Sequence, residues 1–80
     1  MSPKAQHAAA YRKLPFFLRS MREQAGLTQR ALGAKIGKPQ SWIHNCEVSN
    51  RRVDMMEFAA WAKSCGVDPV DALKWLLEGD

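Results

Sequence analysis

The stretch that decides the fold is TQRALGAKIGKPQSWIHNCE, residues 28–47. It predicts a short helix over residues 29–36, because Thr28 suits the N-cap position and Gly37 suits the position after the last turn. A second helix begins at residue 39 or 40 and reaches about residue 47. Two helices of about two turns each are unstable alone, so we expect them to pack against the rest of the chain.

The same stretch has the features of a tight helix-turn-helix. Gly33 is small enough for the second helix to approach the first, and Gly37 can take the positive φ that a turn needs. The apolar residues that lock the pair are Leu32, Ile36, Ile43 and Cys46. The opposite edge of the second helix is polar and free of acidic residues; it comprises Gln40, Ser41, His44 and Asn45. Units of this kind place their second helix in the major groove of DNA.

Three further helices flank this unit, each with its own start and stop signals. Pro15, at a first helical position, predicts a helix over about residues 15–24 that ends before Gly26. Asp54 has capping-box spacing to Glu57, and it predicts a helix that runs to about residue 65. Asp68 caps the last helix. We expect the inward face of that helix to be Val70, Leu73, Leu76 and Leu77.

No segment alternates in the manner of a strand, so the predicted fold class is all-α, a compact bundle of five helices. A chain of 80 residues fits one domain. We expect residues 1–10 to be a tail, either flexible or helical through its Ala-rich part, and residues 11–80 to form the domain.

Charge is divided unevenly along the chain. Residues 1–52 carry 10 basic and 2 acidic residues, whereas residues 53–80 carry 2 basic and 6 acidic residues. The first part therefore has a net charge of +8 and the second a net charge of −4, within a total of +4. Such a division suggests one end that faces a polyanion and another that faces solvent or a partner.

Other classes of protein are not predicted. No apolar run approaches the roughly 20 residues of a membrane span, and no signal-peptide core is present, so we expect a cytoplasmic protein. Cys46 and Cys65 are interpreted as reduced, buried thiols rather than as zinc ligands. Neither a phosphate-binding glycine loop nor a nucleophile elbow occurs, so we predict no enzyme, no metal and no cofactor.

A series of motifs extends over about residues 14–77. In order they are Thr28-Gln29, Leu32-Gly33, Ile36-Gly37, Pro39-Gln40-Ser41, Ile43, Glu47 and Arg51-Arg52-Val53-Asp54. This series resembles the Cro and phage-repressor type of helix-turn-helix regulators, the lambda-repressor-like family. The resemblance implies a five-helix DNA-binding domain that pairs to read two half-sites about 34 Å apart.

The resemblance also implies roles for matching positions. Gln40 matches a position that reads a base edge, and a glutamine there can bond bidentately to adenine. The further base-reading candidates are Ser41, His44 and Asn45. The candidates for binding phosphate are Gln29, Lys38, Trp42, Arg51 and Arg52. For Trp42, core packing and a contact from its indole N–H to a phosphate both stay open.

Other matching positions are structural. Arg22 and Glu47 match an ion pair between the first helix and the end of the recognition helix, which would orient that helix. Ser49 stands where the family usually has Gly, so either this turn is strained or Asn50 takes the left-handed conformation. Trp75 lies opposite the expected inward face of the last helix, and we expect it to be covered by the N-terminal tail or to contact a second subunit.

These features predict a sequence-specific regulator of transcription, a repressor, that binds double-stranded DNA at a palindromic operator as a homodimer. With no ligand-sensing domain expected, control would come from concentration, a partner protein or proteolysis. The alternative is an antitoxin-like or protein-interaction module that uses the same fold with a partner protein and binds DNA weakly or without specificity.

Overall fold

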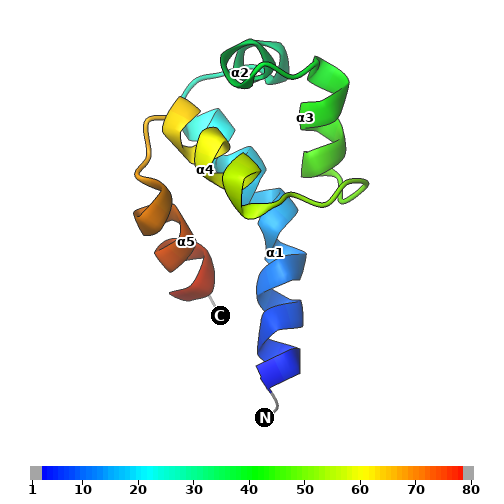
Figure 1. Cartoon of the computed structure of the whole chain (residues 1–80), viewed down its shortest axis with the longest axis vertical. Coiled ribbons are helices and arrows are strands. Elements are labelled where there is room, and N and C mark those ends of the chain that lie inside the picture. The colour runs from blue at the N-terminus through cyan, green and yellow to red at the C-terminus, as the bar shows by residue number, and fades with distance from the viewer. Residues whose placement is uncertain (1–2, 79–80) are drawn as a thin grey trace.

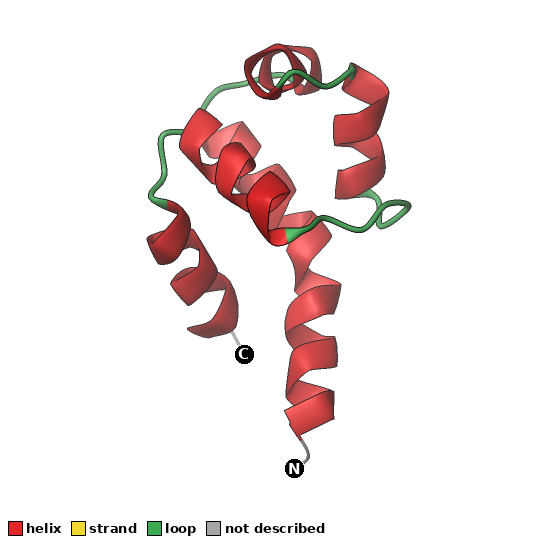
Figure 2. Cartoon of the chain, in the orientation of Figure 1, coloured by secondary structure: helices red, strands yellow, loops and turns green. Residues whose placement is uncertain are grey.

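The structure is a computed structural model that describes residues 3–78 and the side chains of residues 11–78. Within residues 3–78 every regular element is a helix, which confirms the predicted all-α class (Figures 1 and 2). The five helices are α1 (Pro3–Gln24), α2 (Gln29–Ile36), α3 (Gln40–Glu47), α4 (Met55–Ser64) and α5 (Pro69–Glu78). In Figure 1, α2 and α3 lie together at one end of the molecule, and the N-terminal part of α1 extends away from the other helices.

The first helix is longer than its sequence signals predict. It begins at Pro3 rather than at Pro15, and Pro15 lies inside it. A proline in a helix lacks the N–H that would bond to the carbonyl four residues earlier, which here is Tyr11. Residues 5–10 include four alanines, and the high helix propensity of alanine favours continuation through this position. Of the expected tail, residues 3–10 are therefore helical, and residues 1–2 lie outside the described part.

Local capping explains the starts of α2 and α4, as predicted. The Thr28 side chain accepts a hydrogen bond from the Ala31 N–H, so α2 begins at residue 29. Asp54 accepts from the Glu57 N–H at 2.7 Å, and the Glu57 carboxylate accepts in return from the Asp54 N–H at 2.9 Å. This complete capping box fixes the first turn of α4.

Trp61 of α4 forms the centre of the core. Its side chain is fully buried, and its indole N–H donates to the carbonyl of Leu18 in α1 at 3.0 Å. An indole N–H buried without an acceptor would cost free energy, so this bond makes the position compatible with tryptophan. The residues that complete the core are Leu14, Leu18, Met21, Leu32, Ile43, Cys46, Phe58, Ala62, Ala72 and Leu76.

The last helix packs through a different face from the one predicted. Ala72 and Leu76 are buried, whereas Val70, Leu73 and Leu77 are exposed. The prediction was wrong for these three residues because α5 has apolar residues around much of its circumference. Periodicity alone therefore could not identify the face that meets α1 and α4. The consequence is an apolar stripe on α5 that no described residue covers.

Candidate nucleic-acid interface

The turn between α2 and α3 depends on two glycines. A Cβ on Gly33 would lie 2.5 Å from the carbonyl oxygen of Lys38, so a larger residue would force the turn away from α2. Gly37 follows the last turn of α2 with φ +83°, and its N–H and that of Lys38 both donate to the Gly33 carbonyl. These contacts bring α3 against α2 in the compact arrangement that the sequence predicts.

The outward side of α3 carries the four predicted base-reading residues. Gln40, Ser41 and His44 are exposed, and Asn45 is half-buried. Ile43 and Cys46 on the opposite side are buried in the core. The helix therefore brings the predicted polar face together on one surface and holds it there by packing the other side.

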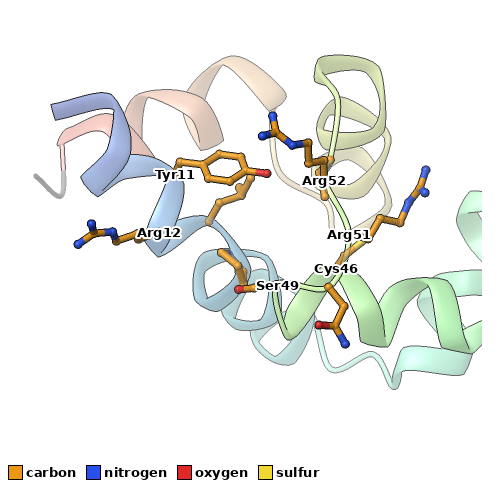
Figure 3. A pocket seen from close by; sticks show the side chains of 10 residues that line it. Tyr11, Arg12, Cys46, Ser49, Arg51 and Arg52 are labelled. Carbon is orange, nitrogen blue, oxygen red and sulfur yellow. The ribbon is translucent and has the colours of Figure 1, made fainter. Parts of the chain in front are cut away.

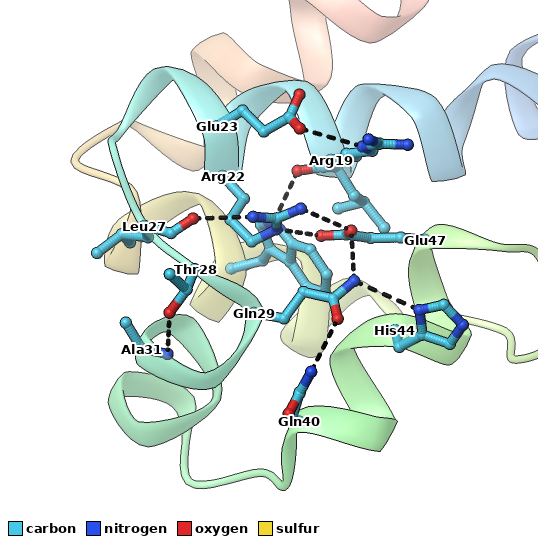
Figure 4. Close-up of polar contacts among 12 residues, drawn as sticks. Arg19, Arg22, Glu23, Leu27, Thr28, Gln29, Ala31, Gln40, His44 and Glu47 are labelled. Atoms are coloured by element: carbon cyan, nitrogen blue, oxygen red, sulfur yellow. Dashed lines mark hydrogen bonds and ion pairs between the residues drawn. The ribbon is translucent and has the colours of Figure 1, made fainter.

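Arg22 and Glu47 form the predicted ion pair, shown in Figure 4. Arg22 Nε donates to Glu47 Oε2 at 2.6 Å, and Arg22 Nη2 donates to Oε1 at 3.0 Å. A third bond runs from Arg22 Nη1 to the carbonyl of Leu27 at 2.8 Å. The hydrogen bonds that Arg22 donates to Glu47 raise the pKa of Arg22 above its usual value, against the effect of desolvation. The pair leaves no uncompensated carboxylate charge on α3, because Glu47 is the single acidic residue among positions 40–47.

A chain of side-chain amides continues from this pair to the exposed surface (Figure 4). Gln29 Nε2 donates to Glu47 Oε1 at 3.0 Å and lies 3.5 Å from His44 Nδ1. Gln40 Nε2 donates in turn to Gln29 Oε1 at 3.4 Å. The predicted phosphate-binding and base-reading glutamines are therefore in contact, although they are 11 positions apart in the sequence. No sequence signal indicated this contact, because it requires the packing of α2 on α3.

Trp42 packs against the core. Its ring lies 6.3 Å from the Trp61 ring, and its indole nitrogen is buried without a hydrogen-bond partner among the described residues. The buried indole N–H favours core packing, the first of the two alternatives for Trp42, and a contact from it to a phosphate stays a prediction. Its ring carries two cations, Lys38 Nζ at 5.3 Å and Arg51 Cζ at 5.1 Å from the centroid.

The loop between α3 and α4 carries Arg51 and Arg52, which contact different partners. Arg51 Nη2 donates to Glu57 Oε2 at 3.1 Å in addition to its contact with Trp42. The Arg52 guanidinium lies 5.8 Å from the centroid of the Tyr11 ring. Ser49 itself takes the left-handed conformation, with φ +68°. Of the two alternatives for this turn, the structure has the strained serine rather than a left-handed Asn50.

Both thiols are free, as expected, but only Cys46 is buried, whereas Cys65 is partly exposed. Burial raises the pKa of the Cys46 thiol to about 11, with a smaller opposing effect of Arg51, so the thiol is neutral at physiological pH. Burial also raises the pKa of Cys65. Among the described residues, no group of three or more His, Cys, Asp or Glu side chains is arranged to hold a metal ion. None of the described helices combines the length and apolar character needed to cross a membrane.

The chain is similar to known helix-turn-helix proteins in both sequence and structure. A family model described as a helix-turn-helix domain matches residues 14–75. Among solved structures, the chain is similar to an XRE-family like protein from Pseudomonas syringae pv. tomato str. DC3000. The two chains are 37% identical, with a TM-score of 0.85 over 95% of this chain and 93% of that chain. None of the curated proteins matches the chain.

Proposed function

The chain belongs to the helix-turn-helix domain family of DNA-binding regulators, as its resemblance to Cro and phage repressors predicts. On this premise we propose that it represses transcription at a specific operator. The observation that carries the proposal is the exposed polar face of α3, which Arg22 and Glu47 hold in place from beneath. In this function α3 enters the major groove, whose base edges carry a distinct pattern of donors and acceptors for each base pair.

Within this proposal, residues on α3 read bases. Gln40 bonds to an adenine edge after it gives up its contact with Gln29, which at 3.4 Å is a weak hydrogen bond. Ser41, His44 and Asn45 supply further contacts along the same face.

Phosphate contacts come from the flanking residues. Gln29 at the start of α2 offers its amide to the backbone, and Lys38, Arg51 and Arg52 supply positive charge. Arg52 suits this role better than Arg51, because Glu57 and the Trp42 ring already engage Arg51. We place this activity in the cytoplasm, on the nucleoid when the protein is bound.

The dimer required for a palindromic operator would pair through α5. Val70, Leu73 and Leu77 form an exposed apolar stripe, and Trp75, on the opposite side of α5, is 52% exposed. Exposed apolar surface of this kind favours association. An isologous pair of α5 helices would relate two α3 helices by a two-fold axis, as a palindromic site needs.

Selection of bound sites from a pool of random duplex DNA, at two salt concentrations, tests the proposal. We expect enrichment of a palindrome, with affinity that falls steeply as salt rises. If no sequence is enriched and binding is weak at both salt concentrations, the alternative holds. The chain is then an antitoxin-like or protein-interaction module, and the acidic residues and apolar stripe of α5 would be its contact surface.

A further inference from the structure

A hollow of about 370 Å³ lies between α1 and the loop that follows α3. Figure 3 shows that Tyr11 reaches from α1 toward this loop and lies near Arg52, while the side chains of Arg12 and Arg51 extend outward from opposite sides of the hollow. Its size lies within the range of roughly 300–1,000 Å³ that is usual for small-molecule sites. The residues that line it are Tyr11, Arg12, Leu14, Pro15, Cys46, Ser49, Asn50, Arg51, Arg52 and Val53.

The lining is strongly positive. Three of the ten residues are arginines and none is acidic. Among the described residues, no carboxylate forms an ion pair with Arg12 or Arg52. Two positive charges beside the hollow are therefore unpaired, so an anion that enters it is favoured electrostatically.

The nearest carboxylates are already occupied. Asp54 and Glu57 line an adjacent hollow that shares Tyr11, Arg51, Arg52 and Val53 with the first. Asp54 accepts from the backbone of Glu57, and Glu57 accepts from the backbone of Asp54 and from Arg51. These groups hold the first turn of α4, and Glu57 also offsets the charge of Arg51, which leaves Arg12 and Arg52 as the arginines of the hollow without a carboxylate partner.

The base of the hollow is apolar and uncharged. Leu14, Pro15 and Val53 contribute aliphatic surface, and Cys46 contributes a buried thiol. The Tyr11 ring, 48% exposed, adds an aromatic surface on which Arg52 already stacks. Such a site suits a ligand with a charged end and an organic group that packs against a ring.

We propose that this hollow binds a phosphate ester. Arg52 holds the phosphate, together with Arg12 once its side chain turns inward. Ser49 and Asn50 supply neutral hydrogen-bonding groups at its edge, and the attached organic group packs on Tyr11. Phosphates of this kind have two sources, a free nucleotide or the sugar–phosphate backbone beside the groove that α3 reads. The second source rests on the proposed function, and the first does not.

Position connects the hollow to DNA binding. The loop of residues 49–53 begins where α3 ends, and Arg52 contributes both to the hollow and to the proposed phosphate contacts. A free nucleotide in the hollow would therefore compete with the DNA backbone for Arg52. Such competition would make DNA affinity sensitive to nucleotide concentration.

The first experiment follows the backbone amide resonances of the isotope-labelled full chain at low salt. The probes are inorganic phosphate, adenosine monophosphate and unphosphorylated adenosine. We expect saturable shifts at Tyr11, Arg12 and Arg52 with both phosphates, larger with the nucleotide, and none with adenosine. Shifts that do not saturate, or that spread over all basic residues, would overturn the inference.

Two variants identify the residues that hold the phosphate. Arg12→Gln and Arg52→Gln should each lower the affinity for adenosine monophosphate roughly threefold to tenfold. This is the range expected for the loss of one exposed charge-assisted hydrogen bond. Lys74→Gln removes one positive charge from the exposed side of α5 and serves as the matched control. An equal loss in Lys74→Gln would mean that only net charge matters, and the site would be rejected.

The second experiment distinguishes the sources with a selected DNA duplex. If the backbone is the ligand, Arg12→Gln lowers the slope of log affinity against log salt by about 1, and adenosine monophosphate displaces DNA. If Arg12→Gln leaves that slope unchanged but lowers the affinity for adenosine monophosphate, the free nucleotide is the ligand. Nucleotide binding without DNA binding would support this site and refute the proposed function. Specific DNA binding with no nucleotide binding, and with a salt slope that Arg12→Gln leaves unchanged, would support the proposed function and refute this site.

Discussion

Nε of Arg22 lies 2.6 Å from Oε2 of Glu47. This ion pair joins the end of α1 to the end of the recognition helix α3. Both side chains are buried, with exposed fractions of 10% and 3%. The third donor of Arg22 bonds to the Leu27 carbonyl, so the guanidinium also holds the segment between α1 and α2. One side chain thus fixes the relative positions of three segments that the proposed interface needs.

Removal of one partner of this pair should destabilise the fold strongly. Glu47→Leu leaves the Arg22 guanidinium buried without its counter-charge, at a cost of about 3–5 kcal/mol in free energy of unfolding. Urea denaturation followed by circular dichroism measures the change. Glu23→Ala is the control, because it removes an exposed pair with Arg19 worth at most about 0.5 kcal/mol. Equal losses in the two variants would contradict a special role for the buried pair.

Replacement of Ser49 by glycine should stabilise the protein. Ser49 has φ +68°, a conformation that costs a residue with a Cβ about 1–2 kcal/mol. The greater freedom of glycine in the unfolded chain offsets part of this cost, so we expect a net gain of about 0.5–1 kcal/mol. Thermal denaturation of Ser49→Gly tests this value. Asn50→Gly should lower the melting temperature instead, since Asn50 has no positive φ to relieve.

The elements that the sequence predicts well are those with local causes. The bounds of α2 and the capping box of α4 depend on side chains within a few residues of each helix start. The same is true of the left-handed Gly37. The polar face of α3 also follows from local periodicity, since burial of Ile43 and Cys46 leaves the other edge exposed.

The features that the sequence predicts poorly depend on long-range packing. Pro15 is compatible with both a helix start and a helix interior, and the alanines before it decide the outcome. The buried face of α5 depends on which helices it meets, and the contact between Gln29 and Gln40 depends on how α2 packs on α3. The buried nitrogen of Trp42 likewise results from its position against Trp61.

Gln40 and Arg52 should affect DNA binding in different ways. Gln40→Ala should relax the preference at one base pair by about 1–3 kcal/mol, because it removes a base contact. Arg52→Ala should weaken binding to all sequences nearly uniformly and reduce the salt slope by about 1, because it removes a phosphate contact. Competition assays with single-base variants of the selected site distinguish the two patterns. A uniform loss in Gln40→Ala would refute its base-reading role.

The buried thiol of Cys46 should make stability depend on alkaline pH. Burial raises its pKa from 9.0 in the unfolded chain to about 11 in the folded protein. The contribution of the neutral thiol is therefore complete below pH 9 and is lost as pH rises toward 11, because the unfolded chain ionises first. The difference in unfolding free energy between wild type and Cys46→Ala should fall by about 2–3 kcal/mol over this interval. A constant difference would show that the thiol does not titrate anomalously.

Charge on the apolar stripe of α5 should disrupt self-association without loss of the fold. Leu77 is 54% exposed and Val70 is 75% exposed, so a glutamate at either position costs little in a monomer. In an isologous interface each substitution introduces two buried carboxylates, and we expect Leu77→Glu to sediment as a monomer where wild type forms a dimer. Glu78→Gln, a change at the adjacent exposed residue, is the control. Trp75→Ala separates the two candidate anchors. If it stays dimeric while Leu77→Glu does not, the stripe rather than Trp75 holds the pair, and a dimer that survives both variants must use another surface.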